Sequence, residues 1–216
     1  MWAAIDAYCE RTSSFFWGEP ANAISNLAFL LAAFVMWRRS AGLPMARAMC
    51  LTLTAIGAGS FLFHTHANGL TAGLDVAPIL GFILIYVFAA TRDLLGWRGL
   101  WPWGAILAFF PYAAATVPIF AWIGVPGSSA GYAPIPILIL GYAVAIGRKA
   151  PGTGKGLAIG AVLLLTSLAF RTLDMPLCTA FPRGTHFLWH LLNAIMLGWL
   201  IEVYRRHLLA GPGAGG

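Results

Sequence analysis

Charged side chains are scarce in this sequence: Asp, Glu, Lys and Arg make up 9% of its 216 residues, whereas soluble domains carry roughly 25%. Hydrophobic residues make up 60%. This composition excludes an ordinary soluble domain and predicts an integral membrane protein. One domain, residues 1–216, accounts for the chain, with an extramembrane N-terminal segment at 1–19 and a flexible tail at 208–216.

Seven apolar segments have about the 20 residues that a helix needs to cross a bilayer. They are 20–37, 46–66, 70–91, 101–119, 130–147, 156–172 and 184–204. Of the thirteen Lys and Arg residues, ten flank one side of these segments, and the other three are Arg11, Arg171 and Arg183. The positive-inside rule then places the N-terminus outside and the C-terminus in the cytoplasm. We predict an all-α bundle of seven transmembrane helices.

The distribution of the basic residues also bears on partners and localisation. The net charge of +6 comes mainly from the basic residues that flank one side of the spans. Because the membrane topology explains this charge, we expect no nucleic-acid partner. The lipid bilayer is the expected partner, with no obligate protein partner. The compact length favours a bacterial inner membrane.

Cysteine is scarce as well, since three residues are too few for a disulfide scaffold. Cys50 lies inside an apolar segment and is best read as a small buried side chain. Cys9 and Cys178 fall on the outer side in this topology, which is compatible with one disulfide between them. The first ten residues lack a basic region and contain Asp6 and Glu10, so we expect no cleavable signal peptide.

Three histidines provide the strongest functional signal. His186 and His190 are four residues apart, so they share one face of a helix, and His64 lies at the same membrane depth on another segment. Three imidazoles with an open fourth position are typical of a hydrolytic zinc site. The competing interpretation is hydrogen bonding between membrane helices. We exclude His66, which points away from His64, and His207, which lies at the cytoplasmic end.

Ser60 and Asp75 are the candidate catalytic residues. Ser60 lies one helical turn before His64, and Asp75 follows a break at 67–70 that predicts a helical hairpin. A carboxylate within a membrane segment is costly and therefore indicates function. Asp75 is the candidate base, and Ser60 is placed to stabilise an oxyanion. The structural alternatives are an acid at a helix N-terminus for Asp75 and helix packing for Ser60.

The N-terminal segment contains a second group of acids. Asp6, Glu10 and Glu19 lie near the asparagines Asn22 and Asn26. Hard oxygen ligands of this kind suit calcium. These residues predict a calcium site, and solvated surface acids are the alternative.

The motifs together resemble those of the alkaline ceramidases, which belong to a superfamily of seven-helix intramembrane hydrolases that includes the adiponectin-receptor relatives. The resemblance rests on Ser60-x3-His64, Asp75 and His186-x3-His190, and on the segments DAYCER, EPANAISN and RTLDMPLC. It implies that His64, His186 and His190 bind zinc, that Asp75 and Ser60 assist water attack on an amide, and that Cys9 pairs with Cys178.

The same resemblance implies calcium binding by N-terminal acids, but the sequence departs from the family there. Ala7 separates Asp6 from Tyr8, where the family has an acid next to the aromatic residue, and Thr12 stands where the family has asparagine. Calcium at Asp6, Glu10 and Glu19 is therefore a weaker expectation than zinc.

We expect a zinc-dependent intramembrane amidase that hydrolyses ceramide-like N-acyl sphingoid lipids to a sphingoid base and a fatty acid. One alternative is a hydrolase of another lipid amide or ester. A second is a receptor-like membrane protein with structural zinc. A retinal protein is set aside because Lys149 and Lys155 lie outside the last span.

Overall fold

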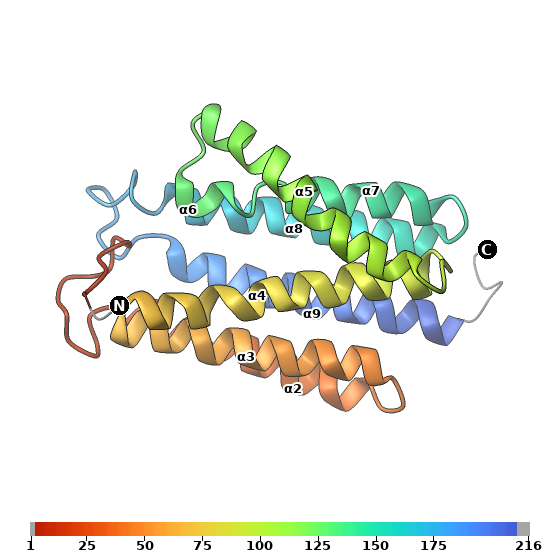
Figure 1. The fold of residues 1–216 in the computed structure, drawn as a ribbon. Coiled ribbons are helices and arrows are strands. Elements are labelled where there is room, and N and C mark those ends of the chain that lie inside the picture. Colours follow the sequence, from red (N-terminus) through yellow and green to blue (C-terminus); the bar gives the residue numbers. More distant parts are fainter. Residues whose placement is uncertain (1–2, 211–216) are drawn as a thin grey trace.

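The computed structural model describes residues 3–210, and within this range it contains helices and turns but no strand (Figure 1). Backbone polar groups in a membrane must be satisfied within their own segment, which favours helices in the apolar stretches. The helices are α1 (Pro20–Ser25), α2 (Leu27–Arg39), α3 (Pro44–His66), α4 (Gly69–Ala89) with a π-helical turn η1 (Ala90–Leu94), α5 (Trp101–Trp122), α6 (Gly127–Ala130), α7 (Ile135–Gly147), α8 (Pro151–Leu173) and α9 (His186–Ala210).

Local signals in the sequence set the ends of these helices. Helices α1, α3, α5, α7 and α8 carry a proline in their first turn, where the missing N–H costs no hydrogen bond. The predicted hairpin at 67–70 is confirmed: the Asn68 side chain accepts hydrogen bonds from the backbone of Leu70 and Thr71 and caps α4. Gly59 lets α3 and α4 approach closely, because a Cβ there would lie 2.1 Å from the Leu74 carbonyl oxygen.

Within residues 3–210, six helices are long and apolar enough to cross a membrane, and they correspond to six of the seven predicted spans. The exception is the predicted span 130–147. There α7 has 13 residues, which at 1.5 Å per residue is about 20 Å, shorter than the roughly 30 Å hydrocarbon core. Prolines interrupt the helix here: Pro126 precedes α6, and Pro134 and Pro136 lie at the start of α7, so that a turn separates the two helices.

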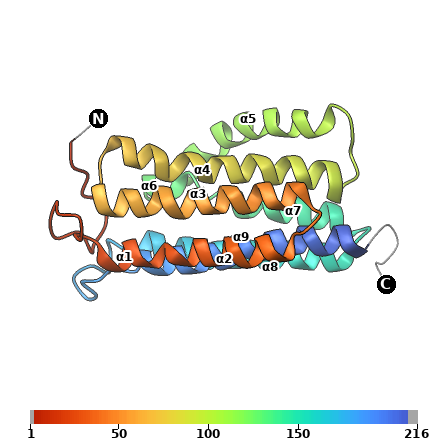
Figure 2. The same ribbon diagram turned by 90° about the horizontal axis from the view of Figure 1, so that it is seen from below.

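The helices form an elongated bundle whose described ends lie at opposite ends of the long axis (Figures 1 and 2). Helix α9 lies inside the bundle and contacts α1, α2, α3 and α8, while α5 crosses obliquely and joins α6 (Figure 1). The turns that carry most basic residues lie at the end opposite the N-terminal segment. The predicted tail at 208–216 is corrected in part: residues 208–210 continue α9, and 211–216 lie outside the described residues.

Candidate metal centre

The three predicted histidines come together at the end of the bundle next to the N-terminal segment. His64 lies near the end of α3, and His186 and His190 occupy the first two turns of α9. One ring nitrogen from each histidine lies within 4.8 Å of the corresponding nitrogens of the other two, which is close enough for the three to share a metal ion. Each residue is at most 1% exposed. The i, i+4 spacing on α9 and the burial of α9 in the bundle produce this cluster.

Glu19 fixes the orientation of His64. A Glu19 carboxylate oxygen lies 2.5 Å from Nδ1 of His64, and the two side chains are 1% and 0% exposed. The same carboxylate accepts hydrogen bonds from Arg11 Nε and Asn22 Nδ2. A carboxylate on one ring nitrogen leaves Nε2 of the histidine free to bind a metal, which is the usual arrangement around metal-binding histidines.

Ser25 does the same for His190. Its hydroxyl lies 2.8 Å from His190 Nδ1 and donates its proton to the Asn22 carbonyl oxygen, also at 2.8 Å. Because the hydroxyl has a single proton, it must accept the proton of His190 Nδ1. This network assigns the neutral tautomer with a free lone pair on His190 Nε2.

The donor set fits a metal ion such as zinc. Among the described residues, the buried nitrogens His64 Nε2 and His186 Nδ1 have no hydrogen-bond partner. Buried polar atoms normally have one, so orphaned imidazole nitrogens facing one another indicate a site for a ligand. Three neutral imidazoles match the ligands of catalytic zinc sites.

Tyr8 and Arg171 cover the cluster from the side. The Tyr8 ring stacks on His186 with centroids 3.8 Å apart, and burial raises the pKa of its phenol to about 12. Tyr8 is therefore a neutral hydrogen-bonding group at physiological pH. The Arg171 guanidinium lies 5.6 Å from the centroid of the Tyr8 ring and 5.2 Å from that of Trp189, and it interacts electrostatically with Asp75.

Ser60 and Asp75 lie at the close contact between α3 and α4. Ser60 is buried one turn before His64 on α3, and its side chain interacts with the carboxyl group of Asp75 on α4. The close approach of α3 and α4 at Gly59 permits this contact. The structure thus brings Ser60 and Asp75 together where α3 and α4 approach, with Ser60 one turn from His64.

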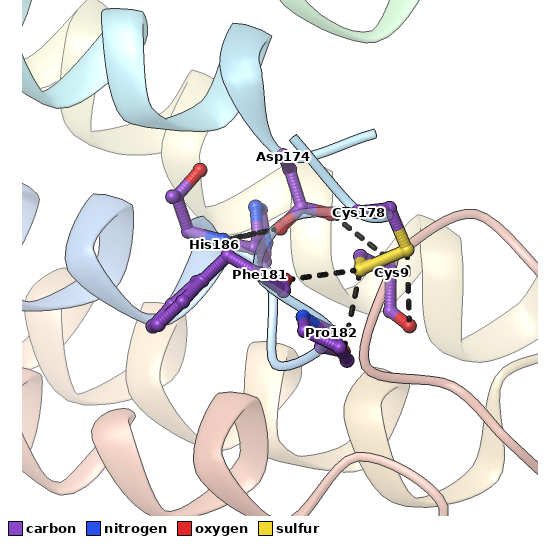
Figure 3. Close-up of a disulfide and its surroundings, with 7 residues drawn as sticks. Cys9, Asp174, Cys178, Phe181, Pro182 and His186 are labelled. Atoms are coloured by element: carbon purple, nitrogen blue, oxygen red, sulfur yellow. Dashed lines mark hydrogen bonds between the residues drawn. A yellow bond between two sulfur atoms is a disulfide. The ribbon is translucent and has the colours of Figure 1, made fainter. Parts of the chain in front are cut away.

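A disulfide holds the N-terminal segment over the cluster, as predicted. Cys9 and Cys178 are bonded with a Cα–Cα distance of 5.4 Å. The Asp174 carboxylate accepts hydrogen bonds from the backbone N–H groups of Cys9, Thr185 and His186, at 2.9, 2.7 and 2.9 Å (Figure 3). Asp174 therefore joins the first residue of α9 to the disulfide-bonded segment, and an acid at this helix N-terminus is electrostatically favourable.

The structure does not support the predicted calcium site at Asp6, Glu10 and Glu19. Over residues 3–210, the three histidines are the one group of His, Cys, Asp and Glu side chains close enough to hold a metal ion. The Glu10 carboxylate instead accepts two hydrogen bonds of 2.7 Å from the backbone N–H groups of Ala21 and Asn22 at the start of α1. Burial raises the pKa of Glu10, and these hydrogen bonds oppose the shift.

A positive charge already lies where calcium was expected. The Arg11 side chain is 6% exposed and donates to Glu19, to the Ser13 carbonyl and to the His64 carbonyl. Asp6 is exposed. The guanidinium thus neutralises Glu19 and ties it to the backbone of α3.

An apolar cleft lies between α4, α7, α8 and α9. Trp189 and Asn193, which flank His190 along α9, line it, and so does Tyr132, which lies with Trp189 against Arg171. The remaining lining residues are apolar or aromatic side chains of α4, α7, α8 and α9: Ile79, Phe82, Ile83, Tyr86, Val87, Ile135, Leu138, Ile139, Tyr142, Leu157, Leu164, Met196, Leu197 and Leu200.

Sequence reasoning missed several contributors to this site. The roles of Ser25, Tyr8 and Asp174 were not predicted, and Glu19 was assigned to a different ion. The only signal for Ser25 was its spacing in the EPANAISN segment. Glu19, Asn22 and Ser25 follow one another at intervals of three residues, so they lie near one another on a helix. Its partner His190 is 165 residues away, and local sequence patterns do not predict contacts between such distant segments.

Comparison of the chain with protein-family models found no matching family, and comparison with curated proteins found no match.

Proposed function

We propose that this protein is a zinc-dependent intramembrane hydrolase that cleaves the amide bond of a ceramide-like lipid. The observation that carries the proposal is the buried histidine cluster, together with an apolar cleft lined by Trp189 and Asn193, which flank His190 on α9. The sequence resemblance to alkaline ceramidases supports the same reaction.

His64, His186 and His190 would hold the metal. Bound zinc supplies a Lewis acid that polarises a carbonyl and makes water more acidic. Glu19 and Ser25 keep Nε2 of His64 and His190 free for this purpose.

Asp75 is the proposed general base and acid. It takes a proton from the water that attacks the amide carbonyl carbon, and it returns that proton to the amine as the carbon–nitrogen bond breaks. Ser60, which faces Asp75 across the close contact of α3 and α4, is the proposed partner that orients the Asp75 carboxyl. Arg171 supplies positive charge on the same side, which stabilises the carboxylate and negative charge that develops on the carbonyl oxygen.

The apolar cleft is the proposed site of a lipid chain. On α9 its lining runs from Trp189 to Leu200, which at 1.5 Å per residue spans about 16 Å. That length suits an extended segment of an acyl chain. The apolar lining favours a hydrocarbon chain over a polar substrate.

In this proposal the chain crosses the membrane seven times. Six crossings are the long apolar helices, and α6 and α7 together form the remaining one, between α5 and α8, as a broken helix. A break is tolerated at membrane depth where the backbone is buried in protein, and Ser129, Ala130 and Ala133 in this stretch are buried. The metal centre then faces the outer side, because most basic residues lie at the other end. A bacterial inner membrane is the proposed location.

The test is fatty-acid release from ceramide by purified protein, with zinc content measured on each preparation. His190→Ala should lose both zinc and turnover. The matched control is His207→Ala, on the same helix at the opposite end, where His207 contacts Thr153; it should keep both. Zinc-loaded wild type without release from ceramide, from other lipid amides or from lipid esters would contradict the hydrolase proposal.

The burial of all three histidines also fits a receptor-like protein with structural zinc, since structural zinc sites are closed. That alternative predicts stoichiometric zinc and no hydrolysis across the substrate panel. Release from another lipid class alone would retain the hydrolase and change its substrate.

A further inference from the structure

The loop Ser13–Gly18, here called the aromatic loop, holds three consecutive aromatic side chains out of the protein. Phe15 is 79% exposed, Phe16 40% and Trp17 57%. The loop directly precedes Glu19 and α1. Large exposed apolar groups in one place indicate an interaction surface.

The aromatic loop is held in shape, so the exposure of its rings is part of the fold. The Gly18 N–H donates to the Phe15 carbonyl at 2.9 Å, and Arg11 donates to the Ser13 carbonyl at 3.2 Å. A side chain at position 18 would not fit, because a Cβ there would lie 2.4 Å from the Ser13 carbonyl oxygen.

Contacts with α3 place the aromatic loop at the depth of the membrane boundary. The Phe16 ring lies 5.2 Å from that of His66, the last residue of α3, and 6.1 Å from that of Phe61, five residues earlier. It therefore lies against the side of the last turns of a membrane-spanning helix, beside the end of the bundle.

The exposed rings continue an apolar surface of the adjoining spans. Leu62 on α3, Ile24 on α1 and Leu27 on α2 are 39%, 54% and 60% exposed. Such side chains on membrane helices face lipid, and aromatic residues are enriched where the hydrocarbon core meets the headgroups.

We propose that the aromatic loop binds the lipid bilayer at the boundary between headgroups and acyl chains, in the leaflet on the side of the metal centre. Phe15 and Trp17 enter this boundary, and Phe16 joins them to α3. The partner is the bilayer surface itself, which the neighbouring spans already contact.

This surface is mechanically connected to the metal centre. Glu19, which hydrogen-bonds His64, follows the aromatic loop directly, and Arg11 bonds Ser13 within the loop, Glu19 after it and the His64 carbonyl. The loop thus docks the N-terminal segment both to lipid and to a metal-binding histidine. A lipid at this boundary lies beside the cluster.

The test measures the depth of a spin label at position 15 in the full-length protein reconstituted into phosphatidylcholine–phosphatidylglycerol bilayers. Phe15→Cys is labelled in a Cys50→Ala background, because Cys50 is the free cysteine among residues 3–210. The control is Arg183→Cys, an exposed position in the connection between α8 and α9 at the same end. The readout is the ratio of collision rates with oxygen, which concentrates in lipid, and with a water-soluble nickel complex.

The proposal predicts an oxygen-to-nickel ratio severalfold higher at position 15 than at 183, and Trp17→Cys should give the same result independently. Equal ratios at 15, 17 and 183 would overturn it, as would low collision rates with both reagents, which indicate burial in protein. The measurement needs no catalytic activity, so its outcome is independent of the proposed hydrolase function.

Discussion

Glu19→Gln tests how the metal centre is held together. The substitution keeps the shape of the side chain but removes the charge that accepts the proton of His64 Nδ1 and faces Arg11. Loss of such a partner of a metal-binding histidine typically weakens metal affinity 10–100-fold, or about 1.4–2.7 kcal/mol. We expect zinc affinity to fall within this range.

The same substitution should also destabilise the fold. The Arg11 side chain is 6% exposed, and removal of one partner of a buried ion pair costs about 3–5 kcal/mol. Glutamine still offers one acceptor oxygen, so we expect the lower end of that range. Replacing Arg11 with Met in the same chain should recover stability but not zinc affinity, because the contact with His64 is still altered.

The assay is competition for zinc with a colorimetric chelator, and Glu10→Gln is the matched control. Glu10 is another buried acid of the same segment, 8% exposed against 1% for Glu19, and its carboxylate accepts hydrogen bonds from the start of α1. It should lose a stabilising contact at a helix N-terminus, worth about 0.3–2 kcal/mol, and keep its zinc affinity. Equal zinc affinity in Glu19→Gln and wild type, or equal weakening in both variants, would refute the assignment of Glu19.

Three further predictions concern catalysis, folding and substrate length. Asp75→Asn should lower fatty-acid release by about 100-fold or more while zinc content stays stoichiometric; simultaneous loss of zinc would show a structural role instead. Gly184→Ala should lower the thermal unfolding midpoint more than Gly42→Ala: both glycines have positive φ, at +67° and +77°, but only the Gly184 Cβ would meet an atom, Asp174 Oδ1 at 2.2 Å, and equal shifts would contradict this account. Ile83→Trp, on the wall of the cleft, should reduce turnover of long acyl chains more than that of short ones, and an unchanged chain-length preference would remove the cleft from the substrate site.

Local patterns predicted the parts of the structure that depend on helical periodicity. The i, i+4 spacing of His186 and His190 and the common depth of His64 were enough to predict the cluster. Hydropathy located six spans, and the prolines at 134 and 136 explain why the predicted span at 130–147 contains a helix of only 13 residues. The Cys9–Cys178 pair followed from topology and from the family resemblance.

The partners of the histidines could not be predicted, because they come from distant segments. Glu19 lies 45 residues from His64, and Ser25 lies 165 residues from His190. The structure gives the calcium prediction no support for a related reason. The sequence places acids close together, but the fold directs Glu10 to the start of α1 and pairs Glu19 with Arg11.

The most direct test of the central claim is X-ray absorption at the zinc edge on purified protein with its metal content measured. The account predicts one zinc per chain with three imidazole nitrogens at about 2.0–2.1 Å, and loss of that signal in His186→Ala. Protein without bound zinc after loading, or zinc with sulfur ligands at about 2.3 Å, would contradict it.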